Sequence, residues 1–233
     1  MAHIGTLKES QLHAALKAWY SGPGDCLETP VDGYVVDILR GQAVIEIQTQ
    51  HFSAIRTKLE RLLETRPVRL VYPIALERWI VRLADDHQTL LGRRKSPRRG
   101  CAAQVFNELV SFPTLLEHPN LTLEILLIRD EEVRCPRTAP GRGRWRKEWR
   151  VSDRRLLEVA SSQVLAGPAD CVAFLPSSLA RPFTNSDLAR AMRQPGRLAS
   201  RLRLASKMTY SLHRMGALVV AGKQGRATTF DMA

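Results

Sequence analysis

The chain has 233 residues, of which 44% are hydrophobic and 25% are charged, so it should fold as one large domain or two ordinary ones. It contains no run of about 18 apolar residues, and its first residues, MAHIGTLKES, have neither an apolar signal core nor a basic lead. We therefore expect neither membrane insertion nor export, with the cytoplasm as the default location. The four cysteines show no CxxC spacing, which indicates neither a zinc site nor a disulfide framework.

The net charge of +12 is distributed unevenly along the chain. Residues 1–90 carry ten Lys/Arg against eleven Asp/Glu, so residues 91–233 hold the whole basic excess, which is mostly arginine. Arginine binds phosphate oxygens through two parallel hydrogen bonds, and such asymmetry favours a polyanionic partner over a merely solvated basic surface. The partner we expect is nucleic acid.

The first element predicted is a helix from about residue 7 to 20, with apolar residues at positions 12, 15, 16 and 19. Thr6 and Glu9 have the Thr-x-x-Glu spacing of a capping box. The stretch 33–49, GYVVDILRGQAVIEIQT, follows as two β-branched runs around an Arg-Gly-Gln break, which predicts a hairpin. Asp37 and Glu46 interrupt its apolar pattern. Because a carboxylate in a buried strand is costly unless it is paired or bound to a cation, these two acids suggest a metal site.

Residues 52–65 predict an amphipathic helix with Ser53 as its N-cap, and residues 68–74 predict a short buried strand. The order α-β-β-α-β over residues 7–74 favours a small mixed sheet flanked by helices. Further strands are expected at residues 77–83 and 121–128, with a helix at 103–116 between them.

Two basic segments interrupt this middle part of the chain. Residues 93–100 read as a loop that either is a solvated turn or contacts phosphate. Residues 134–150 form a second basic loop, in which Trp145 and Trp149 could stack on bases or attach the loop to a core.

From Ser152 onward the pattern predicts short helices, at 152–165, 169–175 and 183–192, then a long basic helix at 198–215 and two short strands. This order of helix, tight turn, basic helix and β-hairpin is typical of a winged helix-turn-helix. The alternative is a helical subdomain whose arginines are solvated. In the DNA-binding interpretation the contacts come from the long helix and the hairpin tip, namely Arg197, Arg201, Lys207, Tyr210, Lys223 and Arg226.

The first third of the chain resembles the PD-(D/E)xK nuclease superfamily. Its Asp37, followed on the next strand by Glu46-Ile47-Gln48, matches that family's Asp and Glu-x-Lys positions, with Gln48 where lysine is usual. The resemblance implies a restriction-endonuclease-like α/β fold and a Mg²⁺ or Mn²⁺ cofactor held by Asp37 and Glu46. Glu9 would match the acid that some members place on the first helix.

The same resemblance assigns Gln48 to orienting the water or the scissile phosphate. Because glutamine cannot supply positive charge, Lys58 on the next helix, or His51, is a candidate substitute for the missing lysine. Asp37, Glu46, Gln48 and Lys58 are thus the expected catalytic residues. The alternative is that Lys58 is solvated and that both acids are ordinary edge-strand charges.

These observations predict a nuclease-like domain over residues 1–150 and a winged helix over 151–233. The expected function is metal-dependent hydrolysis of DNA phosphodiesters, with the winged helix binding double-stranded DNA and a homodimer as a possible assembly. The alternative is a catalytically inactive DNA-binding transcriptional regulator with a nuclease fold, and a nuclease acting on RNA is less favoured. The enzyme class that we expect is a Mg-dependent deoxyribonuclease.

Overall fold

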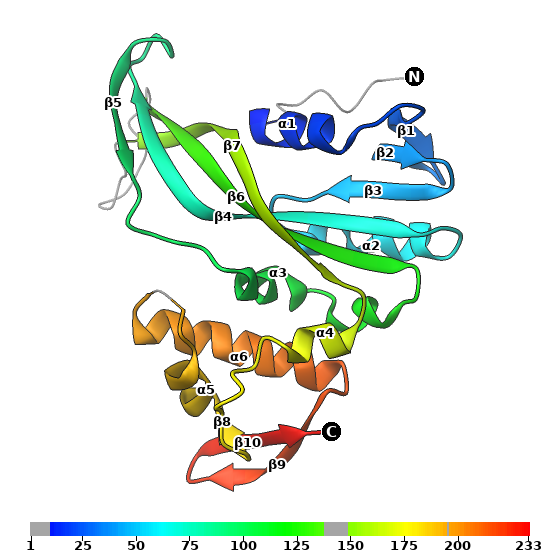
Figure 1. The fold of residues 1–233 in the computed structure, drawn as a ribbon, viewed down its shortest axis with the longest axis vertical. Coiled ribbons are helices and arrows are strands. Elements are labelled where there is room, and N and C mark those ends of the chain that lie inside the picture. The colour runs from blue at the N-terminus through cyan, green and yellow to red at the C-terminus, as the bar shows by residue number, and fades with distance from the viewer. Residues whose placement is uncertain (1–9, 138–148, 195) are drawn as a thin grey trace.

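A computed structural model describes residues 10–137, 149–194 and 196–233, and its main feature is a seven-stranded mixed sheet flanked by helices (Figure 1). The strand order is β1-β2-β3-β4-β6-β7, with β5 paired to the end of β4. The β3–β4 and β4–β6 pairs are parallel and the other described pairs of this sheet are antiparallel. The strands are β1 (Cys26–Val31), β2 (Tyr34–Arg40), β3 (Ala43–Ile47), β4 (Val68–Leu83), β5 (Leu90–Lys95), β6 (Leu121–Pro136) and β7 (Trp149–Leu165).

Helices cover the two faces of this sheet. The helix α1 (Gln11–Tyr20) buries Leu12 and Leu16 against strand residues such as Ile45 on one face. The helix α2 (Phe52–Leu63), the short η1 (Ala102–Val105), α3 (Phe106–Leu109) and η2 (Pro113–Glu117) pack on the other. Each helix is amphipathic, and burial of its apolar stripe against the sheet is what orders it.

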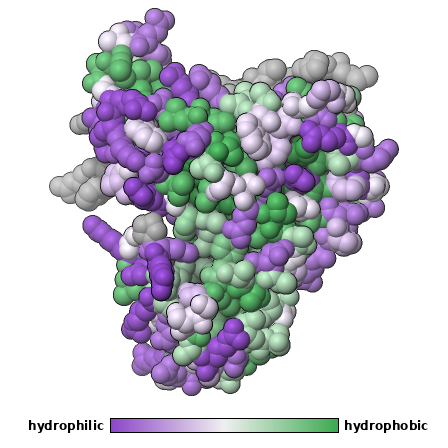
Figure 2. Space-filling view, viewed as in Figure 1, coloured by the Kyte–Doolittle hydropathy of each residue, from purple (hydrophilic) through white to green (hydrophobic). Residues whose placement is uncertain are grey.

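The long strands β4, β6 and β7 continue past the helices and, with β5, form an arm at the upper left of Figure 1. Figure 2 shows that the surface of this arm is mostly hydrophilic. A small apolar cluster of four side chains, Val81, Leu83, Val133 and Cys135, lies within the arm.

The chain after β7 forms a second group of elements around a three-stranded sheet of order β8-β10-β9. The N-cap Thr184 and Asp187 form a reciprocal capping box at the start of α5. The group is not separated from the large sheet, because α6 packs on both α3 and η2 and one apolar core contains residues of both. Its elements are α4 (Pro168–Val172), β8 (Phe183–Thr184), α5 (Asn185–Ala191), α6 (Leu198–Arg214), β9 (Leu218–Gln224) and β10 (Ala227–Met232).

Several predicted elements are confirmed. The mixed sheet flanked by helices is present, and the predicted hairpin is β2–β3, joined by a turn at Gly41 with φ 58°. The helices α2 and α6 and the final hairpin β9–β10 lie where the sequence predicts them. β1 is an additional strand at the edge of the sheet, paired with β2.

Other predicted elements are wrong. Residues 152–165 are not a helix but most of β7, an edge strand with many solvated side chains. Residues 77–83 continue β4 instead of forming a separate strand, and residues 93–95 belong to β5 instead of a loop. The single helix expected at 103–116 is broken into three short segments, the last of which begins at Pro113.

The N-caps also differ from expectation. Ser10 caps α1 by accepting a hydrogen bond from His13 N, and His51 instead of Ser53 occupies the N-cap of α2. Thr6, Glu9 and Trp145 lie outside the described residues. The division into domains at residue 150 stays a prediction, while the large sheet itself continues to Leu165. None of the helices in the described ranges is long and apolar enough to cross a membrane.

Candidate functional site

The two acids of the hairpin lie where its strands part. β2 and β3 pair from Arg40 and Ala43 at the turn to Ile38 and Ile45, and the pairing ends there. Asp37 and Glu46 are the next residues on the two strands, while β3 continues beside β4. Beyond this point side chains replace the backbone pairing of β2 with β3: Asp37 N donates to Glu46 Oε2, and Ile47 N donates to Asp37 Oδ2.

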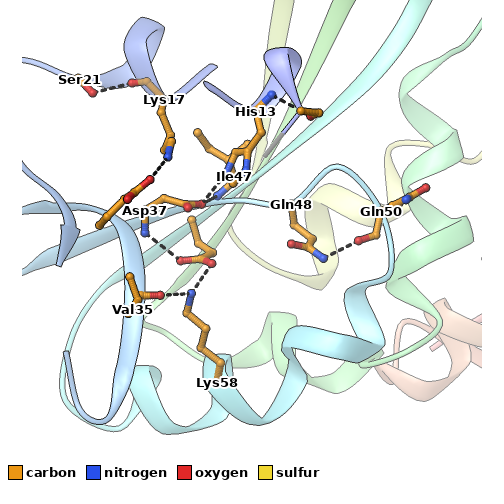
Figure 3. A network of polar contacts seen from close by, with 12 residues as sticks. His13, Lys17, Ser21, Val35, Asp37, Ile47, Gln48, Gln50 and Lys58 are labelled. Carbon is orange, nitrogen blue, oxygen red and sulfur yellow. Dashed lines mark hydrogen bonds and ion pairs between the residues drawn. The ribbon is translucent and has the colours of Figure 1, made fainter. Parts of the chain in front are cut away.

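Asp37 is held from the α1 side. Its Oδ2 accepts a hydrogen bond of 2.7 Å from Ile47 N and lies 3.1 Å from His13 Nε2 (Figure 3). Burial opposes ionisation of this carboxyl, but His13, the Ile47 N–H and the charge of Lys58 together hold the pKa of Asp37 below its usual value. Asp37 is therefore anionic at neutral pH.

Glu46 is held from the α2 side. It is only 5% exposed; its Oε1 pairs with Lys58 Nζ, and its Oε2 accepts a hydrogen bond from Asp37 N at 3.4 Å. Lys58 Nζ also donates to Val35 O at 2.7 Å, which fixes its position beside β2 (Figure 3). Burial, and then the negative charge of Asp37, raise the pKa of Glu46 above its usual value.

The sequence explains why these groups converge. On α1, His13 lies three residues before the buried Leu16, so the two side chains lie on the same side of the helix and the His13 ring reaches Asp37. On α2, Lys58 precedes Leu59, and its side chain is only 15% exposed because it passes along the sheet to reach Glu46. Two helices on opposite faces thus each supply one cationic or titratable group to the parted strands.

The acids have the donor chemistry that a hard divalent cation prefers. Carboxylate oxygens suit Mg²⁺ or Mn²⁺. Both hydrogen-bonding contacts of the Asp37 carboxylate with described residues involve Oδ2, and none involves Oδ1. Burial is the main cause of the raised pKa of Glu46, the negative charge of Asp37 adds to it, and Lys58 opposes both. A cation between the carboxylates would offset their negative charges, so the residues fit a metal. Among the described residues no cluster of three His, Cys, Asp or Glu side chains forms a complete ligand set.

The remaining predicted site residues lie apart from the acids. The Gln48 amide donates to the carbonyl oxygens of Gln50, at 2.5 Å, and His51, at 3.3 Å, and Figure 3 shows it directed toward Gln50 and away from Asp37. His51 is exposed, with a left-handed backbone (φ 60°), at the start of α2. Glu9 lies outside the part of the chain that the structure describes.

The predicted DNA contacts fall into two groups. Arg197 at the start of α6, Tyr210 on its outer face and the β9–β10 residues Lys223 and Arg226 are exposed. Arg201 and Lys207 instead face inward. Arg201 Nη1 donates to Met192 O at 2.9 Å, and Lys207 Nζ contacts Asn107 Oδ1 at 3.2 Å.

Two groups were missed by sequence reasoning. His13 was not predicted as a site residue, although it lies three residues before Leu16 on the buried side of α1. On α6, Arg203 and Arg214 were not predicted as DNA contacts, although both are exposed and recur at helical spacing with the predicted Tyr210.

Comparison with known proteins identifies a family. A model described as "Domain of unknown function (DUF8091)" matches residues 10–166, which include the whole large sheet and α1 to η2. A relative from Treponema pallidum (strain Nichols), described as "Uncharacterized protein", is 32% identical over 188 residues, covering 80% of this chain and 74% of that protein. No solved structure matches the chain. The chain therefore belongs to the family of the domain of unknown function DUF8091.

Proposed function

We propose that this protein is a metal-dependent endonuclease that hydrolyses DNA phosphodiester bonds. The single observation that carries the proposal is the convergence of Asp37, Glu46 and Lys58 where β2 and β3 part. Two carboxylates with a lysine beside them are the groups that phosphodiester hydrolysis in PD-(D/E)xK-like enzymes requires. Lys58, on α2, would provide the charge that Gln48 lacks.

Each residue has a definite part in this proposal. Asp37 and Glu46 would hold a Mg²⁺ or Mn²⁺ ion, which when bound lowers the pKa of an attacking water and stabilises negative charge at phosphorus. His13 and the Ile47 N–H both contact Asp37 Oδ2 and so fix the orientation of this carboxylate. Lys58 carries a positive charge fixed by Val35 O, which would stabilise the developing charge on a phosphate oxygen.

The C-terminal group would bring DNA to this site. The elements from α4 to β10 follow the order helix, strand, helix, helix and two strands. This order is compatible with a winged helix whose recognition helix is α6. The outer face of α6 and the tip of the β9–β10 hairpin carry exposed basic residues, and Tyr210 on α6 is 51% exposed. Contacts from Arg203, Tyr210 and Arg214, with Lys223 and Arg226 on the hairpin, would then hold duplex phosphates.

The test is cleavage of linear, supercoiled and branched DNA by the pure protein with and without Mg²⁺ or Mn²⁺. Cleavage should require the metal and should be lost in Asp37→Asn and Glu46→Gln while DNA affinity persists. The matched control is Glu60→Gln, which removes a charge from the exposed side of α2. Absence of cleavage on all three substrates, or equal activity in Glu46→Gln and Glu60→Gln, would refute the proposal.

A second function, DNA binding without catalysis, is favoured by one observation. The Gln48 amide is hydrogen-bonded to the β3–α2 turn instead of facing the carboxylates. A protein of this kind would bind one short duplex site with an affinity that Asp37→Asn and Glu46→Gln leave unchanged, and it would show no cleavage. The same two assays therefore separate the two functions.

A further inference from the structure

A basic cleft lies beside the candidate site, on the α3 side of the sheet. It has a volume of about 720 Å³ and is bounded by β4, β6 and β7, by residues 96–100 below β5, and by α3. Thr49 and Gln50, just after β3, also line the cleft, and they follow Glu46 closely in the sequence. We call it the arginine cleft because six arginines line it, against Glu108 and Glu132: Arg78, Arg94, Arg98, Arg99, Arg134 and Arg154.

The floor of the arginine cleft is held rigidly by buried acids. Asp130, 0% exposed, accepts two hydrogen bonds from Arg78, each of 2.8 Å, and two from Arg154, of 3.0 and 2.6 Å. Glu132 pairs with Arg78 at 2.8 Å and with Arg134 at 2.7 Å. Guanidinium groups fixed in this way lose little freedom when they bind an anion, so the floor is preorganised.

The rim of the arginine cleft carries available charge. Arg94 and Arg98 are exposed, and neither has a carboxylate partner within the described ranges, unlike Arg99, which lies 3.2 Å from Glu77. The 96–100 segment is pressed against β4 at Gly100, whose N donates to Ala75 O at 3.0 Å. A Cβ at Gly100 would lie 2.4 Å from that oxygen, so only glycine allows the segment to close the cleft here.

The arginine cleft connects the candidate site to α6. A second hollow of about 260 Å³ shares Gln104 and Asn107 with it and extends to Arg203 and Lys207. At the opposite end, Gln50 follows Glu46 by four residues, which span at most ~14 Å of extended chain. A basic path therefore runs from near the carboxylates to the C-terminal group.

We propose that the arginine cleft binds a single strand of nucleic acid. Its volume is that of a small-ligand site, roughly 300–1,000 Å³, which suits a short stretch of one strand better than a duplex. Its lining combines arginines with an aromatic ring, Tyr72, which Phe52 supports edge-on at 5.0 Å between ring centres. Basic side chains with an aromatic base-stacking surface are the recognition elements of single-strand binding sites.

The choice of DNA as the bound polymer rests on the proposed function. A cleft that holds one strand narrows the substrate to DNA with a single-stranded part. If the C-terminal group binds duplex while the arginine cleft binds one strand, the preferred substrate is DNA in which a duplex adjoins a single-stranded segment, such as a fork or overhang. The cleft, close to the carboxylates, would hold the strand that passes the cleavage site.

The experiment measures binding alone, so it does not depend on cleavage. Affinity of a fluorescent single-stranded oligonucleotide is measured by anisotropy in EDTA, over a range of salt, for wild type and Arg94→Ala/Arg98→Ala. Loss of two phosphate contacts should reduce the salt slope by about 1.4 and weaken binding ~25-fold at 0.1 M salt. Arg56→Ala/Arg61→Ala is the control, because it removes the same charge from exposed α2 positions.

A second variant tests the stacking contact. Tyr72→Leu should weaken binding roughly 5- to 150-fold with little change in salt slope, and Tyr72→Phe should restore it. Thermal denaturation of each variant shows whether it is folded. The inference is overturned if the cleft and control variants bind the strand equally, if blunt duplex loses as much affinity as single strand, or if free phosphate competes as well as the oligonucleotide does. Failure of the nuclease proposal would instead appear as absent cleavage with this binding intact.

Discussion

Replacing Asp130 by alanine should destabilise the protein far more than removing a surface acid. Asp130 is fully buried between β4 and β7 and is the common acceptor for Arg78 and Arg154, whose side chains are 25% and 22% exposed. The substitution leaves two guanidinium groups, each largely removed from water, without their main partner. Their repulsion is then relieved only in part, by Glu132.

The magnitude follows from this burial. Removing one member of a buried ion pair costs about 3–5 kcal/mol of unfolding free energy. For a chain of this size, 1 kcal/mol corresponds to a change in Tm of about 2–4 °C. Asp130→Ala should therefore lower Tm by roughly 6–20 °C. Glu158→Ala breaks a comparable pair with Arg129, but there the side chains are 52% and 36% exposed, so the loss should stay below about 1 kcal/mol.

Differential scanning calorimetry of the two variants, with urea unfolding as a second measure, provides the comparison. Equal small shifts for Asp130→Ala and Glu158→Ala would show that the floor of the arginine cleft is not an interdependent network. If the network exists, Asp130→Ala should cost much less in a background where Arg78 and Arg154 are already alanine.

Three further outcomes are expected. Lys58→Gln should reduce metal-dependent cleavage at least about 100-fold, as loss of a charge-stabilising group does, while DNA affinity in filter binding changes little. Gly100→Ala should lower Tm and oligonucleotide affinity together, because the added Cβ would lie 2.4 Å from Ala75 O. Gly92→Ala should change neither, because a Cβ there meets nothing within 4 Å. Asp187→Ala should cost about 1 kcal/mol in urea unfolding through loss of the α5 capping box. Hydrogen bonds from Thr184 lower the pKa of Asp187, so this contribution is present above the ordinary carboxyl pKa and is lost as pH falls through the lowered value.

Local sequence predicted the elements whose apolar residues face a single partner. The β2–β3 hairpin has a glycine turn between β-branched runs, and α2 and α6 have one buried stripe each, so period and turn chemistry agree with the fold. The placement of Asp37 and Glu46 on adjacent strands followed from the hairpin alone. Lys58 was also predicted at this site, whereas the contact of Asp37 with His13 depends on how α1 docks on the opposite face, which no local pattern specifies.

The largest wrong prediction, the helix at 152–165, has a tertiary cause. β7 is an edge strand whose side chains are solvated at most positions, so it shows no alternation, and its pairing with β6 along 14 partner positions decides its conformation. The arginine cleft was likewise not predicted as a site, because its residues come from segments as distant as Thr49 and Arg154. The basic segment 93–100 was predicted as a loop that either is solvated or contacts phosphate, but its strand β5 and the glycine contact that positions it are tertiary features.

The shared apolar core makes the C-terminal group a structural cover for the large sheet. Met208 and Leu212 of α6 are fully buried in the same cluster as Leu109 and Leu116, which lie in the family-matched part. A fragment ending at residue 166 would expose these side chains to water and should aggregate or recruit another chain. A protein consisting of the matched region alone would need a different covering element there, so the evolution of the appended elements is constrained by folding as well as by any ligand they bind.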